Sequence, residues 1–302
     1  MNVVTGAFGY SGKYIARRLV NAGETVITLT GEVNRSNEFG AAVRAFPFRF
    51  EDPEAMAASI AGAHTLYNTY WVRFDRKNES HDRAVRNTVA LVRAAKIAGV
   101  RRIVHISITN PSLDSRLPYF RGKALLEQEI RQSQISYAIV RPTVIFGAED
   151  ILINNIAFLL RNLPAFIVPG DGRYRLQPVY VEDVAQIAVE AGQRFENTTI
   201  DAVGPESFEF EELVRLIAKT LGKRTRILNG PPWLALLASQ LLGMALSDVM
   251  LTRDELTGLM ANLLISSSAP AGQTLFSNWV SANAATLGRR YTSEIRRHYA
   301  VA

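Results

Sequence analysis

The sequence predicts an α/β protein, in which a doubly wound parallel sheet is followed by a smaller and mostly helical C-terminal lobe. Strand-like and helix-like segments alternate with short links through residues 1–204. Such alternation produces parallel strands joined by right-handed crossovers, with helices on both faces of the sheet. A glycine-rich turn, TGAFGYSG, lies between the first strand-like and the first helix-like segment. Beyond residue 205 the chain has mainly helical periodicity.

The expected strands are short apolar runs, and the expected helices carry apolar residues three and four positions apart. We expect strands at residues 2–6, 24–31, 44–52, 64–71, 101–109, 135–147 and 197–204. We expect the helices between them at residues 11–23, 52–63, 79–100, 119–133 and 183–193. The second of these helices opens with Asp52 as its N-cap and Pro53 at its first position, which are residue types that those positions favour.

The C-terminal lobe is expected to consist mainly of helices at residues 207–222, 232–246 and 252–260, with one or two more in 279–300. Ser207 is the expected N-cap of the first, and Thr252 with Glu255 predicts a capping box for the third. The segment 232–246 is apolar and lacks a clear polar, basic face. We therefore expect it to be a buried helix in preference to a membrane-surface or partner helix.

The composition excludes several classes of function. The 302 residues include no cysteine, which excludes disulfides, thiolate metal sites and cysteine nucleophiles. The net charge is +6, but no run of five or six basic residues occurs, so we expect no nucleic-acid partner. The histidines lack metal-ligand spacing, and we expect no metal site. The start of the chain does not resemble a signal peptide and no apolar run predicts a transmembrane segment, so we expect a cytoplasmic protein.

The glycine-rich turn predicts a dinucleotide-binding site and a Rossmann-type fold, because its three glycines lie between a strand and a helix. Gly6 permits the tight turn, Gly9 lets the backbone approach a pyrophosphate, and Gly12 lets the helix pack closely on the strand. The N–H groups at the start of the helix then face the phosphates, whose charge the helix dipole favours. The residues of this turn expected at the cofactor are Gly6, Phe8, Gly9, Tyr10, Ser11, Gly12 and Lys13.

The end of the second strand predicts NADP as the cofactor, with NAD as the alternative. Sites that prefer NAD carry an acidic residue there for the ribose 2′-hydroxyl. This chain has Thr30 and Gly31 at that place, with Glu32 one residue later. Lys13 and Arg35 are cations that suit a 2′-phosphate. The other interpretation is that both are solvated surface residues.

Five stretches make the chain resemble the short-chain dehydrogenase/reductase superfamily, in its extended and atypical branch. They are TGAFGYSG, RRIVHIS, YFRGK with Tyr119 and Lys123, IVRPTVIFG, and QPVYVEDVA. Within that branch the chain is most similar to NmrA-like and isoflavone-reductase-like proteins. It is also similar to the nucleotide-binding accessory subunit of respiratory complex I. The resemblance covers roughly residues 1–222.

The resemblance implies roles for individual residues. In active members the tyrosine of the Tyr-x-x-x-Lys pair is the acid and base, and the lysine lowers its pKa and holds the nicotinamide ribose. These roles fall on Tyr119 and Lys123, with Ser107 as the neighbouring hydroxyl. Ile108 occupies the position that usually carries a serine or threonine, and Arg49 a position that often carries an aspartate for the adenine. Further residues expected beside the cofactor are Asn68, Thr69, Pro142 and Thr143.

Two hypotheses for function follow, and a third shares the same framework. The first is an NADP-dependent oxidoreductase that acts on a small organic substrate, as a monomer or a homodimer. The alternative is a non-catalytic dinucleotide sensor or assembly factor, and the third is a sugar-nucleotide epimerase or dehydratase. The expected domains are an NAD(P)-binding domain at 1–204, with a substrate-lobe insertion near 148–176, and a small substrate or interaction lobe at 205–302.

Two polar or aromatic stretches allow two interpretations each. Tyr70, Trp71 and Phe74 form either an aromatic wall of a substrate pocket or a hydrophobic plug under a loop, since pockets and cores share aromatic composition. Asn154 and Asn155 either line the same cleft or lie on a helix surface.

Overall fold

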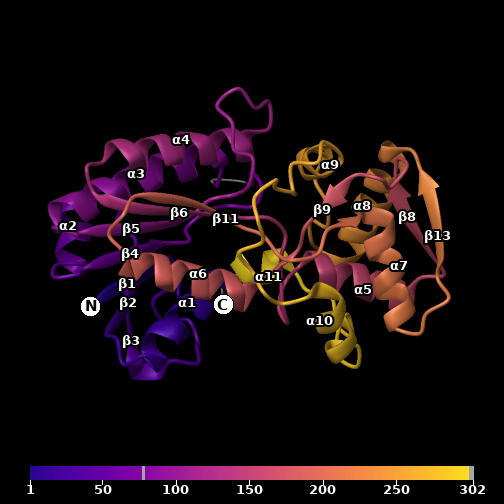
Figure 1. Ribbon diagram of the computed structural model, residues 1–302, viewed down its shortest axis with the longest axis horizontal. Coiled ribbons are helices and arrows are strands. Elements are labelled where there is room, and N and C mark those ends of the chain that lie inside the picture. The colour runs from indigo at the N-terminus through magenta and orange to yellow at the C-terminus, as the bar shows by residue number, and fades with distance from the viewer. Residues whose placement is uncertain (77–78, 299–302) are drawn as a thin grey trace. The chain divides into compact units, whose positions relative to one another are not determined.

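A computed structural model describes residues 1–76 and 79–298 of the chain (Figure 1). The chain forms two compact units, each built from two stretches of sequence. The first unit is Met1–Pro142 with Val181–Ala202, and the second is Thr143–Tyr180 with Val203–Ala302. The last residues of the helical segment expected at 279–300 lie outside the described residues.

The first unit is built around a seven-stranded parallel sheet in the order β11-β6-β5-β4-β1-β2-β3. Its strands are β1 (Asn2–Thr5), β2 (Val26–Thr30), β3 (Val43–Pro47), β4 (Thr65–Asn68), β5 (Arg102–Ile106), β6 (Ser136–Pro142) and β11 (Thr198–Ala202). Strands β1, β2 and β5 are buried at every residue, as expected for strands that helices cover on both faces. The predicted parallel sheet is confirmed.

Helices cover both faces of this sheet, which confirms the doubly wound arrangement (Figure 1). Helices α1 (Tyr10–Asn21) and α6 (Val181–Gln193) pack together on one face. On the other lie α2 (Pro53–Ser59), α3 (His81–Ile97) and α4 (Pro118–Gln132). Asp52 caps α2 as predicted, because its carboxylate accepts a hydrogen bond from Ala55 N at 2.9 Å.

The strand order reverses between β1 and β4, and this reversal locates the candidate site. The chain starts at β1, adds β2 and β3 on one side, and then crosses to β4 on the other. In open α/β sheets, ligands bind at the carboxyl ends of the strands at such a point. The glycine-rich turn follows β1, and Asn68 and Thr69 stand at the end of β4, so all of them lie at this point of the sheet.

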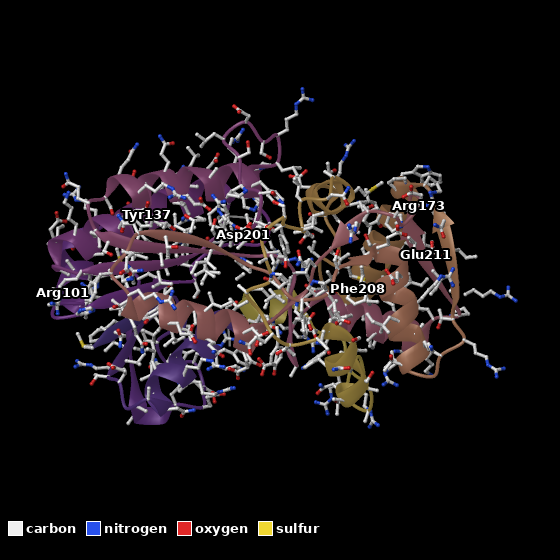
Figure 2. The ribbon with its side chains drawn as sticks, in the orientation of Figure 1. Arg101, Tyr137, Arg173, Asp201, Phe208 and Glu211 are labelled. Atoms are coloured by element: carbon white, nitrogen blue, oxygen red, sulfur yellow. The ribbon has the colours of Figure 1, made fainter. Side chains whose placement is uncertain are left out.

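The second unit packs helices against a parallel pair of strands, β8 and β13. Its helices are α5 (Leu152–Asn162), α7 (Phe210–Thr220), α8 (Pro232–Leu246), α9 (Arg253–Met260), α10 (Phe276–Asn283) and α11 (Glu294–His298). Its strands are β7 (Ile145–Phe146), β8 (Ala165–Pro169), β9 (Arg175–Leu176), β10 (Val179–Tyr180), β12 (Phe208–Glu209) and β13 (Arg226–Gly230). The core of this unit includes Phe146, Leu213, Phe276 and Phe208, the last of which Figure 2 labels.

Several expected element bounds differ from those observed, and two of the differences have a clear local reason. The strand expected at 135–147 is interrupted: β6 ends at Pro142, which has no N–H to donate to a ladder, and a separate short strand follows at Ile145. Helix α7 begins at Phe210, with Glu209 and not Ser207 as its N-cap. The Glu212 carboxylate accepts a hydrogen bond from Glu209 N at 3.4 Å, and this contact defines the start of the helix.

Helix α8 forms where the sequence predicts a helix, but the expectation that it is buried is wrong. Only Ala235 and Gly243 are buried, whereas Trp233 is 64% exposed and Met244 is 70% exposed. A helix that is apolar on all sides gives no periodic signal that tells the packed side from the open side. The described part of the chain contains no helix that is long and apolar enough to cross a membrane.

Candidate functional site

The glycine-rich turn joins β1 to α1 with a backbone that favours glycine at two places, for different reasons. Gly6 has a φ of +62°, which glycine adopts without steric cost. A β-carbon on Gly12 would lie 2.3 Å from the carbonyl oxygen of Gly6, so α1 approaches the turn at a distance that only glycine permits. Gly9 is the N-cap of α1, and the first turn of that helix contains no acidic residue. These features fit a pyrophosphate held by helix N–H groups.

The side chains of the turn are half-buried around this backbone. The ring of Phe8 stacks on that of Phe39 at 6.5 Å, and the ring of Tyr10 meets that of Tyr14 edge-on at 5.9 Å. The ammonium of Lys13 lies 5.3 Å from the centre of the Tyr14 ring. Ser11 is also half-buried, in the first turn of α1.

A buried hydrogen-bond network ties the ends of β1, β4 and β5 together beside the turn. The Thr5 hydroxyl donates to Asn68 Oδ1 at 3.1 Å, and Thr69 N donates to the Thr5 hydroxyl at 2.8 Å. Thr69 Oγ1 donates to the Thr5 carbonyl at 2.6 Å and lies next to Gly6. Asn68 Nδ2 lies 3.0 Å from His105 Nδ1. The Asn68 side chain therefore holds strand ends together, and its backbone and Thr69 adjoin the glycine-rich turn.

His105 is a packed residue of this network. Its side chain is fully buried in β5, and burial holds its pKa well below the usual value, with the charge of Lys123 acting in the same direction. A neutral imidazole whose Nδ1 accepts from Asn68 Nδ2 carries its proton on Nε2. His105 therefore acts as a neutral part of the strand-end network.

The end of β2 carries no carboxylate. The strand ends at Thr30, whose hydroxyl accepts a hydrogen bond from Glu32 N at 3.3 Å. Arg35 lies in the loop after β2 and is half-buried, and its carbonyl accepts a hydrogen bond from Asn37 Nδ2 at 3.0 Å. Glu32 is exposed two residues after the strand, and the next acid, Glu38, is paired with both ends of the Arg17 guanidinium at 2.7 and 3.0 Å. The guanidinium of Arg17 therefore neutralises Glu38.

Trp71 covers the face of α4 that carries Tyr119 and Lys123. Its ring lies edge-on to that of Tyr119 at 5.6 Å, and the Lys123 ammonium lies 4.5 Å from its centre. A β-carbon on Gly122 would lie 2.8 Å from the Trp71 ring, so the glycine provides the space in which the indole packs. Tyr119 and Lys123 share one helix face, and the indole of Trp71 packs against both.

Lys123 is almost completely buried, at 2% exposure, and its ammonium donates to the Ile106 carbonyl at 2.8 Å. Burial lowers its pKa to about 7, and the carboxylate of Glu127 opposes that shift in part. The ammonium is therefore held by a main-chain oxygen of β5 and by an aromatic ring.

Ser107 is engaged by a buried ion pair. Its hydroxyl donates to Glu127 Oε1 at 2.7 Å, and the same carboxylate accepts two hydrogen bonds from the Arg141 guanidinium, at 2.8 and 2.5 Å. Glu127 is 4% exposed, and its hydrogen bonds raise the pKa of Arg141. The Ser107 hydroxyl is thus directed at Glu127, one helical turn beyond Lys123.

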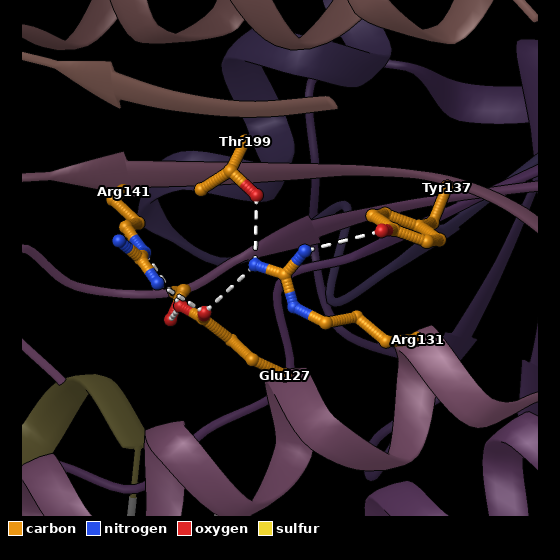
Figure 3. A network of polar contacts seen from close by, with 6 residues as sticks. Glu127, Arg131, Tyr137, Arg141 and Thr199 are labelled. Carbon is orange, nitrogen blue, oxygen red and sulfur yellow. Dashed lines mark hydrogen bonds and ion pairs between the residues drawn. The ribbon is translucent and has the colours of Figure 1, made fainter. Parts of the chain in front are cut away.

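The same carboxylate connects α4 to the last strands of the sheet (Figure 3). Arg131 reaches Glu127 at 3.5 Å and donates to the Thr199 hydroxyl at 2.8 Å and the Tyr137 hydroxyl at 3.1 Å. These contacts fix the position of α4 against β6 and β11.

The remaining predicted residues lie at the ends of strands. The Pro142 carbonyl accepts from Thr109 N at 3.0 Å, and Ile108 between Ser107 and Thr109 is buried. In the second unit, the Thr143 hydroxyl donates to the Gln177 carbonyl. Because its hydroxyl has this main-chain partner, Thr143 has a structural role within the second unit.

The aromatic stretch after β4 packs as a plug within the first unit. Asn87 Nδ2 donates to the Tyr70 hydroxyl at 2.7 Å, and the Tyr70 ring lies 5.0 Å from that of Phe50. Phe74 is buried. A hollow of about 400 Å³ adjoins this cluster and is lined by Phe50, Glu51, Arg83, Arg86 and Asn87.

Asn154 and Asn155 belong to the interior of the second unit and not to a helix surface. Both are buried, and Asn154 Nδ2 donates to Asp150 Oδ2 at 2.9 Å while Asn155 Nδ2 donates to the Thr292 carbonyl at 3.0 Å. The two residues hold the chain together around the start of α5.

Sequence reasoning missed Glu127, Arg141 as its partner, and the role of Gly122. Glu127 follows Lys123 by four residues and Arg141 precedes a proline at a strand end, so both positions were visible. A carboxylate on the helix face that carries a lysine expected to be buried needs a charged partner, and this pattern could have predicted the Glu127–Arg141 pair. The contact of Trp71 with Gly122 joins segments far apart in sequence and has no local signal.

The parallel sheet, its reversal between β1 and β4, and the glycine-rich turn together define an NAD(P)-binding α/β fold. The chain belongs to the NAD dependent epimerase/dehydratase family, whose sequence profile matches residues 2–203. The resemblance to extended short-chain dehydrogenase/reductase proteins is thereby confirmed.

Similar chains include subunits of mitochondrial NADH dehydrogenases and an assembly factor. The chain is 27% identical over 263 residues to the 40 kDa subunit of mitochondrial NADH-ubiquinone oxidoreductase of Neurospora crassa, with 84% of this chain and 68% of that protein covered. It is 25% identical to subunit 9 of the NADH dehydrogenase 1 alpha subcomplex of Arabidopsis thaliana, covering 76% of this chain and 60% of that one. It is 24% identical to a photosystem II assembly factor of Guillardia theta, covering 86% of each. The chain thus spans about three fifths of the Arabidopsis subunit's length.

Solved structures share the fold at low identity. The NADPH-dependent quinone oxidoreductase of Escherichia coli, determined with NADPH, matches with a TM-score of 0.75 and 19% identity, over 93% of this chain and 99% of that one. A UDP-glucose 4-epimerase of Thermotoga maritima matches with a TM-score of 0.64 and 18% identity, over 77% and 86%.

Proposed function

We propose that this chain is an NADP-binding protein that serves as a non-catalytic subunit or assembly partner of a larger protein complex. The observation that carries the proposal is the Trp71 ring, which packs against both Tyr119 and Lys123. A tyrosine ionises near pH 10 unless a cation lies beside it. Here the ammonium of Lys123 donates to a main-chain carbonyl and faces an indole, so it is poorly placed to promote proton transfer by Tyr119.

The serine supports the same conclusion. A hydroxyl that assists a tyrosine must point toward the reacting oxygen, within hydrogen-bond distance. The hydroxyl of Ser107 instead donates to Glu127, which Arg141 holds by two further hydrogen bonds. The position beside it that would carry a second hydroxyl is Ile108. The three residues that resemble a catalytic set are therefore each committed to contacts within the fold.

Partner binding is supported by the relatives. The Neurospora and Arabidopsis proteins are named as subunits of a respiratory complex and the Guillardia protein as an assembly factor. In such a role the nucleotide stabilises one folded form of the protein that a partner recognises, and no turnover is required. A small-molecule substrate is not needed for this function.

NADP is the proposed nucleotide because of the charges at the end of β2. No carboxylate ends that strand, and Glu38 is already neutralised by Arg17. Arg35 follows in the adjoining loop, where a guanidinium suits a 2′-phosphate. A cytoplasmic location stays a prediction.

A reductase is the second candidate, because Tyr119 and Lys123 share one face of α4 and the pKa of Lys123 lies near neutrality. In that case a bound nicotinamide would supply the hydride that the substrate accepts, Tyr119 would donate the proton to the substrate, and Trp71 would have to move first. An epimerase would need the hydroxyl that Ile108 replaces.

The two candidates differ in their dependence on Tyr119. We compare wild type, Tyr119→Phe and the matched control Tyr137→Phe in NADPH titrations and in NADPH consumption with carbonyl, enone and quinone compounds. The proposal predicts saturable NADPH binding by all three proteins and consumption at the background rate. A rate that falls about 10²- to 10⁴-fold in Tyr119→Phe alone would establish the reductase instead.

A further inference from the structure

Helix α8 presents an apolar stripe to solvent. Trp233, Leu237, Leu241 and Met244 are 64%, 45%, 55% and 70% exposed, respectively. They follow one another at intervals of four, four and three residues, which places them on one side of an α-helix. We call these four side chains the α8 face. Isolated exposed apolar residues are ordinary, but a contiguous stripe of this kind marks an interaction surface.

The fold determines which side of α8 is exposed. The opposite side packs on the β8–β13 pair: a β-carbon on Gly230 would meet Ile167 at 3.2 Å and Leu234 at 3.6 Å. Gly243 is buried against the Asp248 carbonyl at a distance that excludes a β-carbon. The other face of β8 contributes Phe166 and Val168 to the core of the second unit. Within this unit α8 is therefore an outer layer, and the α8 face points away from the unit's core.

The chain around the α8 face is cationic. From residue 213 to residue 247 the sequence has five basic residues and no acidic residue. Three of the basic residues, Lys223, Arg224 and Arg226, are exposed in the turn and strand that lead directly into α8. Successive side chains of β13 point to opposite faces of the sheet, so Arg226, Leu228 and Gly230 lie on the same face. Leu228 is 51% exposed, and Gly230 packs beside Leu234.

We propose that the α8 face and the basic turn before it dock on the surface of an anionic phospholipid bilayer, with α8 lying in the plane of the interface. A helix in this position inserts its apolar side chains at the boundary of headgroups and acyl chains, where tryptophan is favoured. Lysine and arginine beside it attract anionic headgroups. An apolar stripe with cations and no acidic residue beside it over residues 213–247 complements an anionic lipid surface.

This surface lies outside the nucleotide site and is independent of it. None of its residues belongs to the first unit, which contains the glycine-rich turn, Trp71 and Tyr119. A failure of membrane docking therefore leaves the proposed NADP binding untouched, and NADPH affinity measured on the same samples separates the two outcomes.

Vesicle flotation of the full chain tests the proposal. Vesicles of phosphatidylcholine alone are compared with vesicles that contain phosphatidylglycerol as the anionic component. Wild type is expected to float with the anionic vesicles and to bind neutral ones much more weakly. Trp233 is 64% exposed, whereas Trp71 is half-buried and Trp279 is 9% exposed, so a blue shift of tryptophan emission on binding reports mainly the insertion of Trp233.

Matched pairs of variants assign the effect to this surface. Trp233→Ser with Met244→Ser is expected to weaken binding on the order of 100-fold, whereas Phe195→Ser, at a site 65% exposed in the first unit, leaves it unchanged. Lys223→Gln with Arg224→Gln is expected to weaken binding roughly 30-fold, at about fivefold for each cation. The control Arg101→Gln with Arg194→Gln, at exposed sites of the first unit, leaves it unchanged.

Three results would overturn the proposal. The first is no flotation with either kind of vesicle. The second is equal binding by wild type and by the Trp233→Ser, Met244→Ser variant, which would locate the lipid contact elsewhere. The third is a wild-type protein that binds no vesicles and is a dimer in light scattering, while the Trp233→Ser, Met244→Ser variant is a monomer. That result would assign the α8 face to a second copy of the chain.

Discussion

Substitution of Gly12 by alanine should both destabilise the first unit and remove dinucleotide binding. The added β-carbon would lie 2.3 Å from Gly6 O, 2.8 Å from Gly6 C and 3.0 Å from Thr5 O. All three are backbone atoms, so no side chain can rotate to make room. Forcing one carbon into packed structure costs about 1–3 kcal/mol, and contact with fixed backbone favours the upper end. For a unit of about 150–250 residues, 3 kcal/mol corresponds to a melting temperature lowered by roughly 6–12 °C.

Two other glycines separate the effect on stability from the effect on binding. Gly31→Ala is the matched control, because that glycine lacks a positive φ and its β-carbon would have no neighbour within 4 Å. Gly9→Ala meets only one atom, Gly6 O at 3.2 Å, and the backbone there is extended. We expect Gly31→Ala to melt as wild type does. We expect Gly9→Ala to melt near wild type but to bind NADPH severely less tightly, since the pyrophosphate must approach that backbone.

Differential scanning calorimetry and fluorescence titration with NADPH measure both quantities on each protein. If Gly12→Ala melts like Gly31→Ala, the close approach of α1 to the turn is wrong. If Gly9→Ala binds NADPH with unchanged affinity, the assignment of this turn to the pyrophosphate is wrong, whatever the melting temperatures.

Three further predictions concern charge. NADPH should bind more tightly than NADH, and Arg35→Ala should reduce that ratio by about 10- to 100-fold, because a charge-assisted hydrogen bond to phosphate contributes about 1.5–3 kcal/mol; competition titrations that show equal affinity for both nucleotides would contradict it. Glu127→Gln should lower the free energy of unfolding in urea by about 3 kcal/mol, because it leaves the Arg141 guanidinium without its carboxylate partner. The control Glu54→Gln changes an exposed pair with Arg93 and should have little effect. The pKa of Lys123 falls from 10.5 to about 7 on folding, so between these pH values the unfolded chain binds one more proton than the folded chain. The free energy of unfolding of wild type should therefore rise with pH across this window, relative to that of Lys123→Met. Parallel curves of unfolding free energy against pH for the two proteins would refute the pKa shift.

The parts of the fold that depend on local sequence were predictable. The glycines at 6, 9 and 12 stand between a strand and a helix, and Asp52 with Pro53 marks the start of α2, so each is determined by neighbouring residues. The alternation of segments was enough to predict the sheet, because parallel strands with short links allow few topologies. The four-residue spacing of Tyr119 and Lys123 is enough to put them on one helix face, as the structure has them.

The contacts that decide the proposed function are not local. Trp71 follows β4 and packs on Gly122 in α4, and no spacing in the sequence relates the two. The sequence does not indicate a hydrogen-bond partner for Ser107, and only the folded sheet brings its hydroxyl to the Glu127–Arg141 pair. The exposure of α8 is non-local as well, because it depends on which side of the helix the β8–β13 pair covers.

The most direct test of the central claim is a crystal structure of the protein with NADPH bound. The account predicts the pyrophosphate at the backbone of the turn between Gly6 and Gly12. It predicts the Trp71 ring still packed on Gly122 and on the Tyr119 ring, with Ser107 still bonded to Glu127. A structure in which Trp71 has moved away and the Tyr119 hydroxyl and Lys123 ammonium both bond the nicotinamide ribose would contradict the claim and establish a catalytic site.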